Sequence, residues 1–224
     1  CSGKNTVKLD CNGFIQRNTQ CVIISATSWD SDITLVYGFN HEDYKPLHKV
    51  ISYGSCTVNA YVPLANYLYT KYGVEDSDVN VIHNIQSYRL EENNTLIRKF
   101  CTLEKSAPSL LSFVNNENFV VNYTVVPYSG VSMIDFRFRL SKKVKLKSLL
   151  RDLEHEFVEG SLKNIYRLSQ VDIGPEVYNC TTYSTVFIKE NVKIVNGSVY
   201  LPGYFDNENS VNRYFDLAQY IVSL

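Results

Sequence analysis

The sequence lacks the short motifs that most often reveal an enzyme. It contains no G-x-G-x-x-G stretch, no G-x-x-x-x-G-K-[ST] loop and no G-x-S-x-G element. A dinucleotide enzyme, a nucleotide phosphate enzyme and a serine hydrolase of the usual kind therefore have no support in the sequence. H-E-x-x-H is absent as well, and His155 has only Glu159 one helical turn later. We therefore expect no metal site and no cofactor.

Apolar runs long enough to cross a membrane are also missing, and no signal peptide is visible. The chain opens at Cys1 rather than at a methionine, which indicates that an upstream segment has been removed. Cys1-Ser2-Gly3 would also suit the lipidated end of a bacterial lipoprotein, and that interpretation stays open as an alternative.

Alanine is rare, and glycine and proline number only 10 and 6, whereas tyrosine numbers 17. Low alanine together with many tyrosine, valine, isoleucine and threonine residues favours strands over helices. Strand and helix patterns do not alternate along the chain, which argues against a doubly wound parallel sheet. We predict a single α+β domain over residues 1–224, mainly antiparallel β, with two sheets packed like a sandwich and about three helices.

The clearest hairpin signals are two Asn-Gly pairs, Asn12-Gly13 and Asn196-Gly197. The β-rich runs 21–29 and 32–39 read as a further hairpin, and the runs 118–126 and 132–140 read as two strands joined through residues 127–130.

Three helices are expected. Pro63 predicts the start of a short helix over residues 64–72. Ser148 begins a second helix with an apolar stripe, and Ser210 begins an amphipathic C-terminal helix with apolar residues at 3.6-residue spacing.

Six cysteines lie far apart, and no two of them form a C-x-x-C pair, so a zinc ribbon or a thioredoxin-type site is disfavoured. An even count with wide spacing is typical of three disulfides in an oxidising compartment. Six reduced cysteines in a cytosolic protein are the alternative. The predicted disulfide cysteines are Cys1, Cys11, Cys21, Cys56, Cys101 and Cys180.

Two further patterns suit an extracellular surface. Four N-x-[ST] sequons permit glycosylation, although so many asparagines produce sequons by chance. They are Asn93, Asn122, Asn179 and Asn196. The stretch S-V-Y-L-P-G-Y-F-D-N-E-N-S predicts a partner-binding loop around Tyr200, Tyr204 and Phe205, because tyrosine with asparagine and serine is common on recognition surfaces.

The most unusual stretch is the basic segment, residues 137–151, R-F-R-L-S-K-K-V-K-L-K-S-L-L-R, which has seven basic residues and no acidic one. Read with period two, it predicts one long strand with an apolar face inward and a basic face outward, and a bulge near Lys142. A stripe of this kind would bind a polyanion, and a solvated strand face is the alternative. The predicted polyanion-binding residues are Arg137, Arg139, Lys142, Lys143, Lys145 and Lys147.

Cys56, in S-C-T-V-N-A-Y-V-P, is the one candidate nucleophile with a structural context. A helix N-terminus favours the thiolate, and a distant histidine could serve as the base. Candidates for that base are His41, His48, His83 and His155. Because Pro63 would break a helix running from Cys56, we favour a disulfide for this cysteine and assign no catalytic residue.

Together these patterns predict a binding protein rather than an enzyme. It would be a secreted or surface-exposed, disulfide-bonded glycoprotein domain, of the general kind found in viruses and parasites. Its partner would be a host protein or a sulfated glycosaminoglycan such as heparin, and the sequence pI of about 6.5 disfavours nucleic acid. Two alternatives stay open: a cysteine hydrolase that uses Cys56, and a structural ectodomain piece of a larger surface or envelope assembly.

Overall fold

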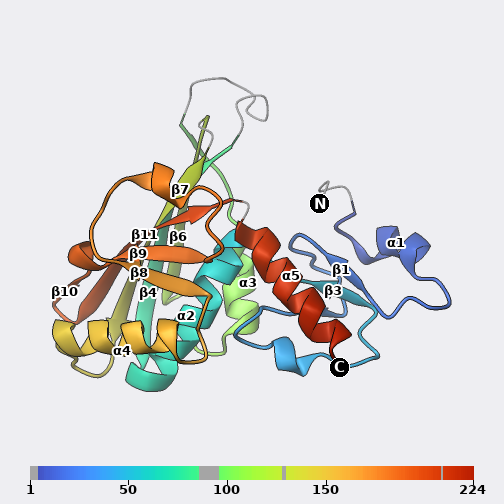
Figure 1. Ribbon diagram of the computed structural model, residues 1–224, viewed down its shortest axis with the longest axis horizontal. Helices are drawn as coiled ribbons and strands as arrows, with labels where there is room; N and C mark the ends of the chain where they lie inside the picture. Colours follow the sequence, from blue (N-terminus) through green and yellow to red (C-terminus); the bar gives the residue numbers. More distant parts are fainter. Residues whose placement is uncertain (1–4, 86–95, 128–129, 208) are drawn as a thin grey trace.

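The computed structural model describes residues 5–85, 96–127, 130–207 and 209–224, and these form two sheets of different kinds (Figure 1). The smaller sheet has three parallel strands in the order β1 (Val22–Ile24), β3 (Val50–Ser52) and β2 (Ile33–Thr34). Helix α5 (Asn209–Val222) packs against it through Leu217 and Ile221. The short helix α1 (Lys8–Cys11) lies beside it.

The larger sheet is mixed and runs in the order β5-β6-β4-β7-β11-β9-β8, with β10 beside β11. Adjacent strands in this sheet are antiparallel, except for two parallel pairs, β4 with β6 and β8 with β9. The strands are β4 (Val74–Asn84), β5 (Ile97–Arg98), β6 (Phe119–Val126), β7 (Val131–Leu140), β8 (Tyr166–Ser169), β9 (Thr185–Ile188), β10 (Lys193–Val195) and β11 (Ser198–Asp206).

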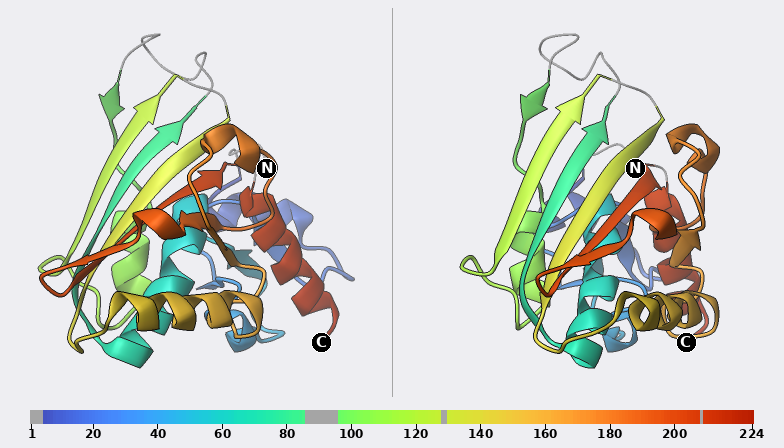
Figure 2. Two further views of the ribbon diagram at one scale, coloured as in Figure 1. Left: turned by 60° about the vertical axis from the view of Figure 1, so that its left-hand side comes forward. Right: turned by 90° about the vertical axis from the view of Figure 1, so that its left-hand side faces the viewer.

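Helices cover one face of the larger sheet (Figure 2), and on the opposite face the 3₁₀ helix Pro175–Tyr178 packs Tyr178 against Val186 of β9 and Tyr204 of β11. They are α2 (Cys56–Tyr72), α3 (Leu103–Leu110) and α4 (Leu146–Val158), and their apolar residues join the inner face of the sheet in the main core. Tyr61 of α2 lies at the centre of this core, where its ring contacts those of Phe119, Phe136 and Phe138. None of the helices formed by the described residues is both long and apolar enough to cross a bilayer.

The predicted antiparallel sandwich is wrong. The runs 21–29 and 32–39 do not form a hairpin, because β3 lies between β1 and β2 and pairs with each in parallel. A long-range contact favours this arrangement: the Asp32 carboxylate accepts hydrogen bonds from the backbone N–H groups of Lys49 (2.7 Å) and Val50 (2.8 Å). These bonds hold the start of β3 beside β2.

The hairpin predicted at Asn12-Gly13 also fails. Around Asn12-Gly13 the chain forms α1 and a 3₁₀ turn over Asn12–Phe14. Strands β6 and β7 form as predicted but are separated by β4, which pairs with both.

Other local predictions are confirmed, although α4 begins at Leu146 rather than at Ser148, and the helix predicted over residues 64–72 begins earlier, at Cys56. Asn196 and Gly197 have φ values of 50° and 82° and join β10 to β11 as a hairpin. Helix α4 buries Leu149, Leu153 and Phe157 as one stripe. Helix α5 covers the predicted C-terminal segment.

Candidate active site

Cys56 lies at the first position of α2, in the β3–α2 junction (residues 50–60). β3 leads through Gly54, whose φ of 87° favours glycine, to Ser55. The Ser55 hydroxyl accepts a hydrogen bond from the backbone N–H of Val58 (3.3 Å) and caps the helix. The first N–H groups of a helix have no partner within it, so those of Cys56 and Thr57 are available to a group bound near the sulfur atom.

Pro63 does not break this helix, which contradicts the sequence prediction. Proline cannot donate to the carbonyl of Asn59, one turn earlier. The buried Tyr166 hydroxyl lies at this point instead, 3.3 Å from the Asn59 oxygen and 2.9 Å from the Ala60 oxygen, and it accepts from the Leu64 N–H at 3.2 Å. The Tyr166 hydroxyl from β8 therefore hydrogen-bonds to the backbone groups around Pro63, where the proline interrupts the hydrogen bonds of the helix.

His83 of β4 faces Cys56. Its Nε2 lies 3.6 Å from the Cys56 Sγ, and its Nδ1 lies 2.7 Å from the backbone oxygen of Asn84. A carbonyl only accepts, so we assign the ring proton to Nδ1, which leaves the Nε2 lone pair directed at the thiol. The Nδ2 of Asn207 also donates to the Asn84 oxygen (2.8 Å).

Burial keeps both groups of this pair neutral. It raises the pKa of Cys56 to about 12, with a smaller contribution from the neighbouring Cys101, while the N–H groups of Thr57 and Cys56 act in the opposite direction. Burial also lowers the pKa of His83. A neutral thiol therefore donates to a neutral imidazole, and this arrangement suits general-base activation of the sulfur during attack.

Aromatic rings form the wall of the site next to His83. The His83 ring contacts the rings of Tyr123 (5.6 Å between centroids) and Phe205 (5.5 Å). On the other side, Thr102 donates to the Ser55 hydroxyl (3.0 Å), and the Thr57 hydroxyl lies 3.5 Å from the Cys101 Sγ.

Period two along β4 could have selected His83 from the four candidate histidines. Val79, Val81 and His83 lie at alternate positions, and both valines are buried on the inner face, where α2 packs. His155, by contrast, is exposed on α4 and lies 3.6 Å from Glu159.

The basic segment does not form the predicted stripe. β7 ends at Leu140, and α4 begins at Leu146, so Lys142, Lys143, Lys145 and Lys147 lie on a turn and on the first part of a helix. The two arginines are on β7 but face acidic residues of β4. Arg137 pairs with Asp76 (2.7 Å) and Asp78, and Arg139 pairs with Glu75 (3.1 Å). Pairing with an acidic strand thus neutralises the part of the segment that is a strand.

The predicted aromatic loop is also wrong, because Tyr200, Tyr204 and Phe205 all lie on β11. Tyr204 is buried, donates to Asp172 (3.2 Å) and stacks on Tyr178. Phe205 is fully buried and contacts His83 from the inner face. Of these three residues, Phe205 is the one that belongs to the candidate site. The sequence had selected it as part of a partner-binding loop, not as a neighbour of His83.

The predicted disulfides are not formed. Cys11, Cys21, Cys56, Cys101 and Cys180 are free, and Cys1 lies outside the described residues. Most of these cysteines fill core positions on separate elements, where a free cysteine behaves as a small apolar residue. The sequons Asn122, Asn179 and Asn196 are exposed, and Asn93 lies outside the described residues.

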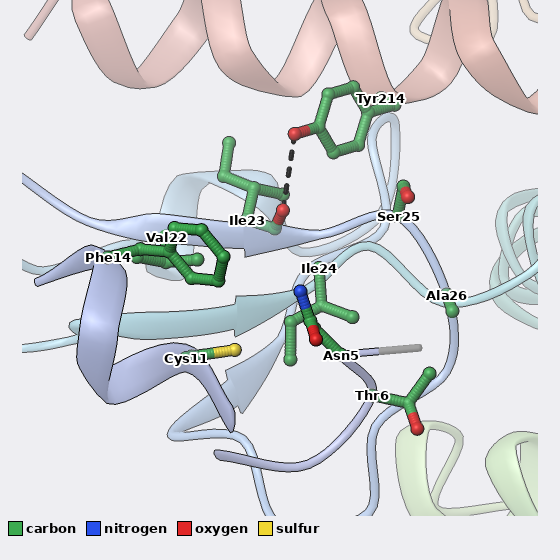
Figure 3. A pocket seen from close by; sticks show the side chains of 10 residues that line it. All are labelled: Asn5, Thr6, Cys11, Phe14, Val22, Ile23, Ile24, Ser25, Ala26 and Tyr214. Carbon is green, nitrogen blue, oxygen red and sulfur yellow. Dashed lines mark hydrogen bonds between the residues drawn. The ribbon is translucent and has the colours of Figure 1, made fainter. Parts of the chain in front are cut away.

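A hollow of about 200 Å³ lies beside β1, and Cys56 is not among the residues that line it (Figure 3). Tyr214 of α5 closes one side and donates a hydrogen bond to the Ile23 oxygen (3.2 Å). Cys11 and Tyr214 are its only titratable lining groups, and burial raises the pKa of both. Among the described residues, the Cys56–His83 pair therefore remains the better candidate for catalysis.

Comparison with known proteins is consistent with a catalytic site. The chain is 30% identical to "Glyceraldehyde-3-phosphate dehydrogenase 1" of Bacillus cereus, over 99% of the chain and 71% of that protein. It is 28% identical to the glyceraldehyde-3-phosphate dehydrogenase of Geobacillus stearothermophilus (99% and 70%). It is 27% identical to "Glyceraldehyde-3-phosphate dehydrogenase 1" of Giardia intestinalis (100% and 70%). No protein-family profile matches the chain.

These relatives overturn the functional prediction. They are oxidoreductases, so the prediction of a non-enzymatic, secreted glycoprotein that binds a host protein or a glycosaminoglycan was wrong, as was its extracellular location. The cysteine hydrolase and envelope alternatives fall with it. The prediction went wrong at Cys56, where the disulfide interpretation displaced the catalytic one. At this level of identity and coverage, the chain belongs to the glyceraldehyde-3-phosphate dehydrogenase family.

Proposed function

We propose that the chain oxidises an aldehyde, with Cys56 as the nucleophile and His83 as the base. The observation that carries this proposal is the 3.6 Å contact between the Cys56 Sγ and the His83 Nε2 at the N-terminus of α2. The relatives are named for glyceraldehyde 3-phosphate, which is therefore the first substrate to test.

The chemistry follows from the two groups. As the Cys56 sulfur attacks the aldehyde carbon, His83 accepts the thiol proton and then returns it to the former carbonyl oxygen, so that the product is a thiohemiacetal. The backbone N–H groups of Cys56 and Thr57 can stabilise the negative charge that develops on the former carbonyl oxygen. Loss of a hydride and the hydroxyl proton then gives a thioester on Cys56, which water or phosphate can cleave to free the sulfur.

The hydride needs an acceptor, and enzymes use nicotinamide or flavin cofactors for this purpose. The carboxyl ends of parallel strands are the usual place for such a ligand, and in the smaller sheet β3 leads from this edge to Cys56. Thr27 follows β1 at the same edge, and its buried hydroxyl oxygen has no hydrogen-bond partner within the described ranges. The adjacent Ala26 oxygen accepts from Ser52 (2.9 Å). Ala26 and Thr27 would therefore help to hold the cofactor that accepts the hydride.

The test is turnover of glyceraldehyde 3-phosphate with NAD⁺ or NADP⁺ in the presence of phosphate. Turnover is measured as the rate at which the reduced nicotinamide forms. We expect turnover with one of the two cofactors. Iodoacetamide should inactivate the enzyme in parallel with labelling of Cys56, and Cys56→Ser should abolish turnover.

Cys180→Ser is the matched control, because Cys180 is exposed and its backbone N–H bonds to Asp206, whereas the contact of the Cys56 sulfur is with His83. This variant should retain both turnover and sensitivity to iodoacetamide. Full turnover by Cys56→Ser, or labelling of Cys56 without loss of activity, would contradict the proposal.

A further inference from the structure

A second cysteine lies beside the proposed nucleophile. Cys101 is in the connection between β5 and α3, and its Sγ lies 3.5 Å from the hydroxyl of Thr57. The next residue, Thr102, donates to the hydroxyl of Ser55 at 3.0 Å. Ser55 and Thr57 are the two chain neighbours of Cys56. These two contacts therefore place residues 101 and 102 directly alongside the first turn of α2.

Tyr123 of β6 supports this arrangement from a third direction. Burial raises the pKa of its phenol, and the charges that Cys56 and Cys101 would carry as thiolates raise it further. Its ring also contacts that of His83. One side chain therefore has both sulfur atoms in its electrostatic environment.

Cys101 has no part in the proposed aldehyde chemistry. It is 3% exposed, and burial raises the pKa of its thiol. The other described cysteines lie elsewhere: Cys11 packs with Ile24 and Val50, Cys21 packs near Tyr44, and Cys180 is exposed. Of the described cysteines, Cys101 is thus the one that can reach Cys56 without a large rearrangement.

We propose that Cys101 is a resolving thiol that forms a reversible disulfide with Cys56 when a hydroperoxide oxidises the active site. With hydrogen peroxide, the Cys56 sulfur takes one oxygen atom to become sulfenic acid, and water leaves. The Cys101 sulfur then attacks the Cys56 sulfur, and a second water leaves as the S–S bond forms. In sum, two thiols lose two electrons and two protons, and one peroxide is reduced to two waters.

The position of Cys101 allows this reaction. The sulfur atoms must approach to about 2 Å. Cys101 belongs to a connection rather than to a helix or a strand, so its approach to Cys56 breaks no hydrogen bond of a helix or a sheet. The disulfide would occupy the nucleophile and stop turnover. It would also protect Cys56 from irreversible oxidation to sulfinic acid. The inference shares Cys56 with the proposed function but does not require turnover of an aldehyde.

A peptide map tests the proposal directly. Trypsin places Cys56 in peptide 50–71 and Cys101 in peptide 100–105. The reduced protein is treated with hydrogen peroxide, alkylated and digested without reductant. We expect the two peptides to be joined, and we expect dithiothreitol to separate them and to restore alkylation of both cysteines. In Cys101→Ser, Cys56 should instead accumulate as sulfinic acid that dithiothreitol does not reverse.

Cys180→Ser is the control and should behave as the unmutated protein does. If Cys101→Ser does not fold, Cys101→Ala replaces it, and the map of the unmutated protein already decides the question. Sulfinic acid at Cys56 without the joined peptides, a bond from Cys56 to another cysteine, or no oxidation of either peptide would overturn the proposal. Aldehyde turnover without the joined peptides would remove this inference alone, whereas joined peptides without turnover would remove the proposed function alone.

Discussion

The β3–α2 junction and the basic segment differ in how their residues find partners. The junction is largely apolar, and Cys56 and His83 are 27 positions apart in the sequence but 3.6 Å apart at their reactive atoms. The basic segment has seven cationic residues within fifteen positions, yet its strand part is matched by Glu75, Asp76 and Asp78. The closely spaced charges of the basic segment are thus partly neutralised by residues of another strand. Cys56 and His83, which are far apart in the sequence, come into contact.

Burial explains why the junction can carry chemistry. In the junction, removal from water shifts the pKa values of a thiol and an imidazole toward their neutral forms, so that a proton can pass between them. In the basic segment, Lys143, Lys145 and Lys147 are exposed, and water and salt screen their charges. The following predictions test this difference, beginning with the largest expected effect.

Replacing His83 should have the largest effect. His83→Asn keeps a polar side chain but removes the base, and kcat should fall by roughly 10²–10⁴-fold. Because burial lowers the pKa of His83, the imidazole stays neutral below the ordinary value of 6.5, and the acid limb of the unmutated pH–rate profile should lie below that pH. The variant should lose this limb. His155→Asn is the control, because His155 is exposed on α4. An equal loss of activity in both variants would remove His83 from the mechanism.

The stability of the junction should depend on Tyr166. Tyr166→Phe leaves buried backbone groups around Pro63 without a partner, at a cost of about 1–3 kcal/mol. The melting temperature should fall by roughly 3–10 °C. Tyr200→Phe, at an exposed tyrosine, should change stability by less than about 0.5 kcal/mol.

A double-mutant cycle sharpens the Tyr166 prediction. Pro63→Ala restores an N–H that can donate to the Asn59 carbonyl, so Tyr166→Phe should cost less in that background. Equal costs in the two backgrounds would show that the hydroxyl does not act through the proline.

In the basic segment, the half-buried, paired Arg137 should matter more for folding than an exposed lysine. Arg137→Met breaks the contacts with Asp76 and Asp78, which are partly screened by water, and should destabilise the protein by about 1 kcal/mol. Lys145→Met should have no measurable effect on urea unfolding, because Lys145 is exposed and has no ion pair among the described residues. A larger loss for the lysine variant would contradict the assignment of the segment as a paired strand followed by a solvated turn.

The smallest effect is expected at Asp152, just beyond the segment. The Tyr72 hydroxyl (2.6 Å), and then Lys71, lower the pKa of this carboxyl from 3.8 to about 2. A lowered folded-state pKa adds stability that is fully present above pH 3.8 and is lost as the pH falls toward 2. The Asp152→Asn variant should therefore lose less stability than the unmutated protein over this range in urea titrations. Glu159→Gln, at an exposed carboxyl, should follow the unmutated curve.

Much of the local structure could be predicted because it depends on residues close together in the chain. The Asn196-Gly197 turn needs two residues that tolerate positive φ, and the α4 and α5 stripes need only a 3.6-residue period. Strand formation by β6 and β7 followed from their β-rich composition. In the same way, the alternation of inward and outward residues along β4 predicts that His83 points inward, but it does not predict that Cys56 is its partner.

The order of the strands and the contents of the site could not be predicted in this way. β3 lies between β1 and β2, which the sequence predicts as a hairpin. The Asp32 carboxylate favours this order because it binds backbone N–H groups 17 and 18 positions away. Pro63 reads locally as the start of a helix, and it lies inside α2, where Tyr166, 103 positions later, meets the backbone groups beside it.

The sequence by itself determined the α4 and α5 helices and the Asn196-Gly197 turn, since those depend on backbone preferences and on neighbours within a few residues. Only the tertiary structure decided that Cys56 would face His83 and Cys101 rather than join a disulfide, and that the arginines of the basic segment would be neutralised. The physical reason is that burial and pairing between distant segments set the partner and the pKa of each group, and neither can be read from the residues beside it.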